Sequence, residues 1–397
     1  MALIVIPFAL GYYVSYLLRT VNAVVSPSLT SELGLTASGL GLLTSAYFVG
    51  FGLAQLPVGI ALDRYGPRRV EGILLLVAAA GSAAFAVGGS MVSLTGARFF
   101  IGLGVSACLM AAVKGISLWY PPEKQSSKTG FVMAAGALGA LTASKPLEML
   151  LPFLGWRGVF WIMTAMSLVA AIVILRVTPE YKSTVKSDTV NNEFKKACRI
   201  FTSSAFFKFA PATTFFPGGF MALQSLWAVP WLMNVEGMSL ADAASSLLIL
   251  NGGMLTGQLL VGFFGTSLVS RGFSPLYIMR AGYGTYIVME CLILFGVGPS
   301  SLLWYVLGIS AASNSQTYIA SSKGFPNDIL GRVVTTFNLM SFIGAFAVQW
   351  GMGIALDSMK CNGHSINTAL FVSFAVLIGL QFLSYLALYK KDKVISI

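Results

Sequence analysis

Long apolar stretches alternate with short polar ones along almost the whole chain. Each apolar stretch is close to the roughly 20 residues that a helix needs to cross the hydrocarbon core of a membrane. Glycine, proline and charged residues mark the turns between the stretches. The pattern predicts an all-α membrane protein with twelve transmembrane helices, at about residues 3–26, 37–62, 70–87, 92–119, 129–153, 157–177, 204–233, 240–268, 274–296, 300–320, 332–356 and 366–389.

The polar segment between the sixth and seventh predicted helices is longer and more charged than the other turns. Residues 178–203 carry lysines among acidic residues, which is typical of a cytoplasmic linker with some amphipathic helix. We therefore expect an N-terminal six-helix bundle at residues 1–177 and a C-terminal six-helix bundle at residues 204–397, joined by a linker at residues 178–203.

A weak internal repeat supports the division into two halves. A shift of about 204 residues places Gly-Val-Ser-Ala at 104–107 on Gly-Ile-Ser-Ala at 308–311, and Lys128 on Arg332. The glycine interval from 59 to 66 recurs from 265 to 272, although Val269 stands where the first copy has Asp63. Two six-helix halves that echo each other on either side of a polar linker are typical of parallel-repeat transporters.

The composition excludes a soluble globular protein. Of the 397 residues, 56% are hydrophobic and only 10% are charged, whereas about a quarter of the residues in a soluble domain carry a charge. The first apolar stretch begins at Met1 without a basic region or a cleavage site, so we expect a retained span and not a signal peptide. The four cysteines are scattered and His364 is the only histidine, so we expect neither a metal site nor a cofactor.

The net charge of +11 is distributed unevenly over the predicted turns. Seventeen of the 25 Lys and Arg residues fall on one side of the predicted membrane, whereas two, Arg157 and Lys360, fall on the other. Basic residues accumulate in turns that stay in the cytoplasm. We therefore predict an integral protein of a bacterial inner membrane with both termini in the cytoplasm, surrounded by membrane lipids and without a nucleic-acid partner.

The turn between the second and third predicted helices has a distinctive pattern. It resembles the signature loop of the major facilitator superfamily, Gly-x-x-x-Asp-Arg-x-Gly-x-Arg-Arg, with its fixed positions at Gly59, Asp63, Arg64, Gly66, Arg68 and Arg69. Two more patterns are similar to that family, Arg-x-x-x-Gly-x-Gly at 98–104 and Gly-Trp-Arg at 155–157. The run from 45 to 59 resembles the members that carry organic or inorganic anions.

The resemblance implies a fold and a mode of action. Two six-helix bundles rock about a central cavity lined by the first, fourth, seventh and tenth helices, and the protein works as a monomer. The signature loop is expected to hold the cytoplasmic side shut, with Asp63 paired to Arg68, Arg69 or Arg332. In the seventh helix, Pro217-Gly218-Gly219 predicts a break that serves as a gating hinge or a binding segment, or that is merely a structural kink.

Arg19 lies inside the first predicted helix, where an ionised group needs a cavity or a partner. We expect Arg19, together with Tyr16 and Asn22, to bind a negatively charged group of the substrate, because a guanidinium suits carboxylate and phosphate. The alternative is that Arg19 snorkels or makes a structural pair. The polar residues that share its face of the helix are Tyr12, Ser15, Tyr16, Asn22 and Ser26.

Other charged residues within the predicted spans offer further roles. Lys114 and Lys145 are candidates for substrate binding, although Lys114 could snorkel and Lys145 could simply pair with Glu148. Glu148 and Glu290 are the only acids predicted inside the spans, and we expect one of them to serve in proton coupling. The resemblance connects Arg98 with coupling or with packing against the first helix. Basic groups outnumber acids in the spans, which predicts an anionic or zwitterionic substrate.

Several uncharged polar groups lie in apolar surroundings in the second half. Gln224 and Trp227 of the seventh helix would offer a hydrogen bond and a flat apolar wall to a substrate. Asn251 and Asn314 are further candidates for substrate binding. Asn338, like Gln55 of the second helix, could instead tie neighbouring helices together.

The function predicted from these features is secondary active transport of a small anionic or zwitterionic solute by alternating access, coupled to protons or to a counter-moving anion. An efflux carrier for amphipathic drugs or siderophores is the alternative within the same fold. A receptor with a transporter fold or an intramembrane enzyme is the alternative of another class. An enzyme would need clustered His, Asp or Glu in the spans, which this chain lacks, and no nucleotide-binding loop is present.

Overall fold

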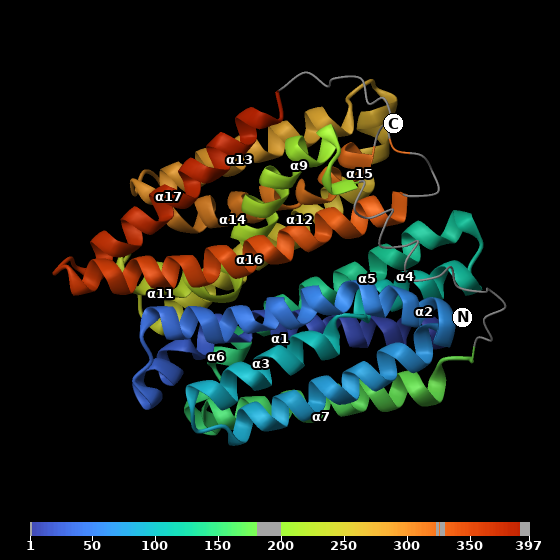
Figure 1. Cartoon of the computed structure of the whole chain (residues 1–397), viewed down its shortest axis with the longest axis horizontal. Coiled ribbons are helices and arrows are strands. Elements are labelled where there is room, and N and C mark those ends of the chain that lie inside the picture. Colours follow the sequence, from blue (N-terminus) through green and yellow to red (C-terminus); the bar gives the residue numbers. More distant parts are fainter. Residues whose placement is uncertain (1, 181–199, 323–324, 326–329, 390–397) are drawn as a thin grey trace. The chain divides into compact units, whose positions relative to one another are not determined.

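The computed structural model describes residues 2–180, 200–322, 325 and 330–389, and their regular secondary structure is helical throughout. Figure 1 shows the path of the chain. Most of the predicted linker, at residues 181–199, and the basic tail from residue 390 lie outside the described residues.

The first half of the chain contains the six predicted passes. The fourth and fifth passes are each divided by a short break, at 106–107 and at 143–144. The helices are α1 (Ala2–Leu33), α2 (Ala37–Val87), α3 (Met91–Val105), α4 (Cys108–Trp119), α5 (Pro122–Thr142), α6 (Lys145–Glu148) and α7 (Leu151–Val177).

The second half of the chain also contains six passes. Its first pass is divided into α9 (Ser204–Phe215), α10 (Pro217–Ala222), a π-helix (Leu223–Trp227) and α11 (Ala228–Asn234). The remaining helices are α12 (Leu240–Ser270), α13 (Pro275–Leu294), α14 (Ser300–Ala311), α15 (Asn314–Ser322), α16 (Leu330–Cys361) and α17 (Ile366–Ala387).

Seven helical stretches of the described chain, one of them formed by α3 and α4 together, are long and apolar enough to cross a membrane. One of them, α2, has 51 residues and holds the second and third passes. The other four passes are broken into shorter helices or, in α13, carry Arg280 and Glu290. The prediction of an all-α membrane protein with twelve helical passes is therefore confirmed.

Two predicted turns are helical in the structure. Most of the turn expected between the first two predicted helices, at residues 27–36, belongs to α1, which continues to Leu33. The loop expected at 59–69 is part of α2, where Gly66 alone leaves the helical conformation, with φ 78° and ψ 162°. A positive φ is accessible to glycine without a steric penalty. The turn between the second and third passes is therefore the single residue Gly66. Arg68 and Arg69 lie after it, at the start of the third pass.

Close contacts of glycines show that the two halves of the chain are structural repeats. A Cβ atom on Gly50 would lie 2.1 Å from the carbonyl oxygen of Phe99, and one on Gly253 would lie 2.1 Å from that of Tyr305. These positions are related by shifts of 203 and 206 residues. The same kind of contact recurs between Gly102 and Tyr47, Gly308 and Leu250, Gly139 and Tyr13, and Gly344 and Thr214.

Glycines with positive φ repeat in the same way at the turns. Gly66 has its counterpart in Gly272, with φ values of 78° and 93°, so the weak glycine interval found in the sequence corresponds to a repeated turn. Two more such pairs are Gly34 with Gly237 and Gly155 with Gly363. The predicted repeat of two six-helix halves is confirmed.

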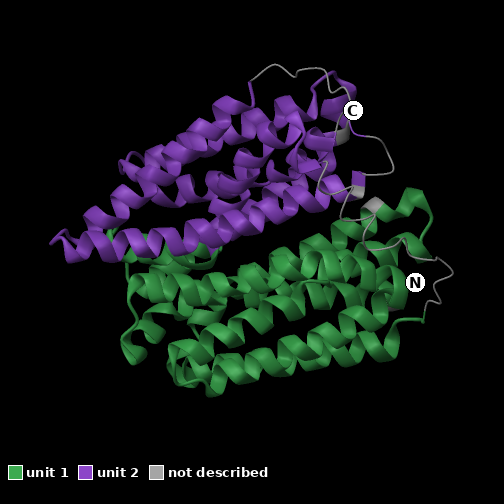
Figure 2. Ribbon diagram, viewed as in Figure 1, with its two compact units in different colours: residues 1–187, 225–248 green, residues 188–224, 249–397 purple. Residues whose placement is uncertain are grey.

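The chain forms two compact units, shown in Figure 2. Unit 1 comprises residues 1–187 and 225–248, and unit 2 comprises residues 188–224 and 249–397. The division falls inside the π-helix, between Gln224 and Ser225. The predicted limits 1–177, 178–203 and 204–397 stay a prediction, since most of the linker lies outside the described residues.

Within unit 1, α2 packs against α3, α4 and α7, and α1 packs against α4, α5 and α7. Within unit 2, α16 packs against α9, α10 and α17, and α13 packs against α14, α15 and α17. The buried polar side chains of these contacts, taken in each unit by itself, are the candidate functional groups.

Candidate functional site

Arg19 lies in the interior of unit 1, with 6% of its surface exposed. Its guanidinium carbon is 4.4 Å from the centre of the Tyr16 ring, one turn earlier on α1, and 5.6 Å from that of the Phe51 ring on α2. The spacing of three residues between Tyr16 and Arg19 places both on one helix face. Aromatic faces attract a cation most strongly where water is excluded. The arginine is thus held in an aromatic setting and does not point into lipid.

The polar stripe around Arg19 connects α1 with α2. The amide of Asn22 donates a 3.0 Å hydrogen bond to Oγ1 of Thr44, and both residues are buried. The hydroxyl of Tyr47 donates to the carbonyl oxygen of Ser15 at 3.4 Å. The side chains predicted to share a face of α1 therefore lie in the protein interior, and Asn22 already has a partner on the neighbouring helix.

Arg98 of α3 is fully buried and contacts α1 beside Arg19. Its Nη1 atom donates a 2.8 Å hydrogen bond to the carbonyl oxygen of Leu18. The guanidinium also faces the rings of Phe85 and Phe160, with its carbon 5.4 and 5.6 Å from their centres. The structure thus shows the packing contact with the first helix, and the coupling role of Arg98 stays a prediction.

Asp63 forms an ion pair with Lys114 of α4, with Nζ and Oδ1 2.6 Å apart. We expected Arg68 or Arg69 as a partner of Asp63, and the structure shows Lys114 in this role. The helix continues through this segment, and Gly66 turns the residues that follow away from Asp63. Both side chains of the pair are partly exposed, at 34% for Lys114 and 55% for Asp63.

The arginines after Gly66 contact the end of the sixth pass. Nε of Arg68 donates a 2.9 Å hydrogen bond to the carbonyl oxygen of Leu175 on α7. Arg69 pairs with Glu180, beyond the end of α7. Arg64 lies over the ring of Tyr65 at 5.2 Å. The signature segment thus joins α2 to α4 on one side of Gly66 and to α7 on the other, while Arg332 belongs to α16 of unit 2.

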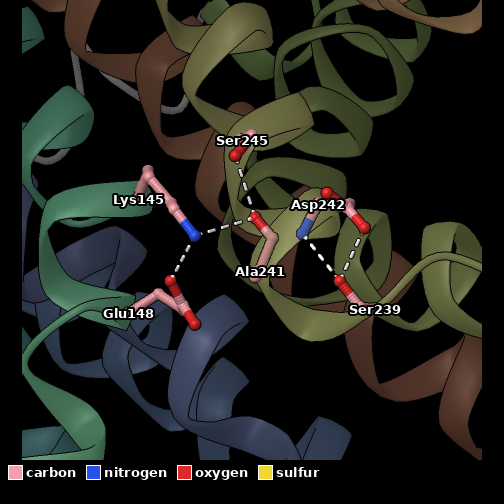
Figure 3. Close-up of polar contacts among 6 residues, drawn as sticks. All are labelled: Lys145, Glu148, Ser239, Ala241, Asp242 and Ser245. Carbon is pink, nitrogen blue, oxygen red and sulfur yellow. Dashed lines mark hydrogen bonds and ion pairs between the residues drawn. The ribbon is translucent and has the colours of Figure 1, made fainter.

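Lys145 lies at the start of α6 and joins it to the start of α12 (Figure 3). Its Nζ atom is 2.7 Å from Oε2 of Glu148 and donates a 3.4 Å hydrogen bond to the carbonyl oxygen of Ala241. The same carbonyl accepts a 2.9 Å hydrogen bond from the hydroxyl of Ser245. The pair between Lys145 and Glu148 is the structural alternative that the sequence left open.

Gln224 lies in the π-helix, where its amide donates a 2.6 Å hydrogen bond to Oδ1 of Asn251 on α12. Both side chains are buried. Trp227 closes the same π-helix and is 2% exposed. Single π-turns inside α-helices occur frequently at functional sites. The break predicted at Pro217-Gly218-Gly219 is present between Phe215 and Pro217, whereas the π-helix was not predicted.

Glu290 lies on α13 near the break in the seventh pass. It is 4% exposed, and its Oε1 atom accepts a 3.5 Å hydrogen bond from the amide of Gln381 on α17. The same amide donates a 3.2 Å hydrogen bond to the carbonyl oxygen of Phe215, the last residue of α9. Glu290 is thus connected to the break through Gln381.

The remaining predicted residues lie on α15, α16 and α2. Asn314 is the first residue of α15, directly after the break in the tenth pass. Oδ1 of Asn338 on α16 accepts a 3.1 Å hydrogen bond from the hydroxyl of Tyr318, so this residue ties two helices together as expected. Gln55 donates to the carbonyl oxygen of Phe51 on its own helix.

Glu71 was left out of the acids counted inside the spans, although it is the second residue of the third predicted helix at 70–87. The expectation that Glu148 and Glu290 are the only acids inside the spans is wrong, since Glu71 is fully buried on α2, five residues after Gly66. Glu71 closely follows three arginines and was therefore grouped with the polar turn. The structure shows that it lies on the helix after Gly66, inside unit 1.

No cluster of three or more potential metal ligands among His, Cys, Asp and Glu is found in the part of the chain that the structure describes. The polar side chains described here are suited to bind a solute by hydrogen bonds and charge. Arg19 and Arg98 both combine burial with an aromatic setting on two helices; Arg98 also donates to the carbonyl oxygen of Leu18.

Comparison with known proteins gives a consistent picture. The family model of the Major Facilitator Superfamily matches residues 8–348. The hexuronate transporter of Bacillus subtilis is 22% identical over 382 residues, which cover 86% of this chain and 89% of that protein. The probable L-galactonate transporter of Escherichia coli is 30% identical over 147 residues, which cover 37% of this chain and 32% of that protein.

Solved structures show the same fold. The crystal structure of a D-xylose-proton symporter superimposes with a TM-score of 0.75 at 16% identity, and the match covers 98% of this chain and 97% of the symporter chain. At this level of identity the similarity concerns the arrangement of helices and not the solute.

Proposed function

The chain belongs to the major facilitator superfamily and is a secondary transporter of the membrane, and we propose that it carries a small organic anion of the sugar-acid class by alternating access. The hexuronate transporter is similar to most of this chain, and the probable L-galactonate transporter is similar to part of it. Each of these solutes combines a carboxylate with several hydroxyl groups. A site for them needs one cation and a set of hydrogen-bonding groups around it.

The burial of Arg19 is the observation that carries this proposal. A guanidinium inside a transmembrane helix costs several kcal/mol unless it meets a cavity or a partner, and that of Arg19 faces the rings of Tyr16 and Phe51. Such rings attract a cation through their faces and carry no opposite charge of their own. Its fork of N–H donors matches the two oxygens of a carboxylate.

The other substrate-binding residues that we propose supply hydrogen bonds, further charge and an apolar wall. In the first half these are Tyr16, Asn22, Lys114 and Lys145, and in the second half Gln224, Trp227, Asn251 and Asn314. The buried hydrogen bond between Gln224 and Asn251 supports a polar group next to the π-helix that a hydroxyl of the solute can join.

The gating and coupling assignments are part of the same proposal. Transport is driven by protons or by exchange with a second anion, with Arg98, Glu148 and Glu290 as the coupling residues considered from the sequence. The gating residues that we propose are Gly59, Asp63, Arg64, Gly66, Arg68, Arg69 and Arg332 at the signature segment, and Pro217, Gly218 and Gly219 at the break of the seventh pass.

We further propose that the protein acts as a monomeric carrier and not as an enzyme, in the inner membrane of a bacterium. Both termini are placed in the cytoplasm, because the basic residues gather on their side of the predicted membrane. Protons or a counter-anion, membrane lipids and the solute are its partners.

A thermal-unfolding screen of the purified protein tests the substrate class. D-galacturonate and L-galactonate are compared with D-galactose, which has the hydroxyl groups but no carboxylate, and with the amphipathic cation ethidium. A ligand present at about 100 times its Kd stabilises a folded protein by about 2.7 kcal/mol. We expect the acids to raise the Tm and galactose to have no effect.

Two matched variants identify the anchor. Arg19→Gln is expected to lose the response to the acids, whereas Arg176→Gln, which removes a charge from an exposed position on α7, is expected to keep it. Stabilisation by ethidium alone, with no difference between the two variants, would favour an efflux carrier for amphipathic compounds and overturn the proposal.

A further inference from the structure

Glu71 differs from the other acids of unit 1 in its surroundings. It is fully buried, and its carboxyl oxygens have no nitrogen or oxygen donor among the residues that the structure describes; the polar group beside them is the thiol of Cys108. Four other acids of the unit have a basic partner. The ion pairs found in its described part are Glu32 with Arg157, Asp63 with Lys114, Glu148 with Lys145 and Glu180 with Arg69.

The carboxyl group of Glu71 lies directly against the backbone of α1. A Cβ atom on Gly11 would be 2.2 Å from its Oε1 atom, so the absence of a side chain at residue 11 creates the space that the carboxyl fills. Ile174 of α7 borders the same space, and Gly72, the next residue of α2, lies against Leu175. The carboxyl is thus enclosed by three packed helices.

Among the residues that the structure describes, no basic side chain near Glu71 forms an ion pair with it. On its own helix, Arg68 is engaged by the carbonyl oxygen of Leu175. From α4 comes the thiol of Cys108, which lies beside the carboxyl, while Lys114 is held by Asp63. On α1, Tyr12 follows Gly11, and on α7 the charged residue of this region is Arg176, which is exposed.

The thiol of Cys108 also connects this place with the candidate anion site. It is within electrostatic range of both Tyr12 and Arg19. Gly11 and Arg19 lie on the same helix, two turns apart. A change of charge on Glu71 therefore acts on the helix that carries Arg19.

We propose that Glu71 is the residue that binds and releases the coupling proton of this carrier. An ionised carboxylate enclosed by apolar helices is costly unless it is paired, and binding one proton removes its charge. The carboxyl packs against Gly11 in its neutral form. Loss of the proton to water leaves a charge that α1 and α2 cannot enclose without separating, which links the charge of Glu71 to the packing of α1.

This inference rests on the proposed function, and it assigns the proton to a residue that the sequence did not offer. Glu148 and Glu290 meet the requirement less well, because the first is paired with Lys145 and the second accepts a hydrogen bond from Gln381. Ionised substrate can then bind at Arg19 in the same cycle in which Glu71 carries one proton.

Infrared difference spectroscopy on purified protein tests the proton site without any substrate. Spectra recorded between acidic and alkaline pH are compared for the wild type, Glu71→Gln and Glu123→Gln, the last being an exposed acid at the start of α5. We expect signals of buried protonated carboxyl groups in the wild type and in Glu123→Gln, and the loss of one of these signals in Glu71→Gln, which leaves the buried Glu290 in place. An unchanged signal in Glu71→Gln overturns the proposal whether or not the solute is a sugar acid.

Transport in proteoliposomes then tests coupling, with radiolabelled D-galacturonate as the probe. Glu71→Gln is expected to keep counterflow of galacturonate but to lose accumulation driven by a pH gradient, so that the accumulation ratio falls to about one, as for a carrier without a driving force. Absence of galacturonate binding in the wild type would refute the proposed substrate class alone, since the infrared result still decides on Glu71.

Two more variants keep the test decisive if Glu71→Gln does not fold. Glu71→Asp retains a carboxyl and is expected to accumulate galacturonate, whereas Gly11→Ala places a methyl group where the carboxyl lies and is expected to impair accumulation more than counterflow. Undiminished pH-driven accumulation in Gly11→Ala or Glu71→Gln overturns the proposal, as does equal loss of counterflow and accumulation in a folded variant. Accumulation of galacturonate that is driven by a sodium gradient and not by a pH gradient also overturns the proposal.

Discussion

The guanidinium of Arg98 donates a 2.8 Å hydrogen bond to the carbonyl oxygen of Leu18, although the two residues are 80 positions apart. The bond fixes α3 to the backbone of α1 one residue before Arg19. Since Arg98 is fully buried and also faces two aromatic rings, it holds α1 in place where the solute is proposed to bind.

Replacement of Arg98 by alanine should therefore destabilise the protein. Hydrogen bonds to charged groups contribute about 1.5–3 kcal/mol, and the change also leaves a cavity beside Phe85 and Phe160. We expect a lower free energy of unfolding by about that amount, measured by thermal or denaturant unfolding in detergent. Arg157→Ala is the control, because Arg157 pairs with Glu32 at a partly exposed position, where a pair is worth about 0–1 kcal/mol. Equal effects of the two changes would contradict this account.

The ion pair between Asp63 and Lys114 predicts a different response. Both side chains are partly exposed, so a double-mutant cycle with Asp63→Asn and Lys114→Met should give a coupling energy of only about 0.2–1 kcal/mol. The transport rate should fall in each single variant, and in Asp63→Asn, which keeps Lys114, solute binding by thermal shift should persist. The charge exchange Asp63→Lys with Lys114→Asp is expected to restore part of the rate. Unchanged uptake in Asp63→Asn would remove Asp63 from the proposed gate.

The passes and the repeat could be predicted because they depend on local properties of the chain. Apolar runs of the right length define the helices, and Arg19 is recognisable as a lone cation in such a run. The glycine interval at 59–66 and 265–272 marks a turn that needs a positive φ, and the structure shows this φ at Gly66 and Gly272.

The partners of charged residues could not be predicted, since they depend on packing between distant segments. Asp63 meets Lys114 across 51 positions, while Arg68 and Arg69, which are closer in sequence, are turned away after Gly66. Glu71 needs the space left by Gly11 on another helix. The π-helix at Leu223–Trp227 has no sequence pattern that distinguishes it from ordinary helix.

Two adjacent glycines on α12 allow a sharp test of the repeated helix contacts. A Cβ on Gly253 would lie 2.1 Å from the carbonyl oxygen of Tyr305, whereas one on Gly252 would have no neighbour within 4 Å. Gly253→Ala should destabilise unit 2 by about 1–3 kcal/mol through overpacking. Gly252→Ala should be neutral or stabilising by up to about 1 kcal/mol, because alanine is the better helix former. Thermal unfolding of both variants measures the difference. A Gly253→Ala variant as stable as the wild type would contradict the close contact.

Lys145 offers a last prediction because it has two partners in unit 1. Its Nζ atom pairs with Glu148, which is 15% exposed, and donates to the carbonyl oxygen of Ala241. Removing one member of a mostly buried pair leaves the other charge uncompensated, whereas removing both is often tolerated. Lys145→Met should therefore destabilise the protein more than Lys145→Met combined with Glu148→Leu, in unfolding measurements on purified protein.

The two variants of Lys145 also separate structure from function. If Lys145 serves only to pair with Glu148 and to fasten α6 to α12, the double variant should recover both stability and affinity for the anion. If Lys145 contributes charge to the substrate site as well, the double variant should regain stability but bind galacturonate more weakly than the wild type. Recovery of neither would mean that the contact with Ala241 dominates, since that hydrogen bond is lost in both variants.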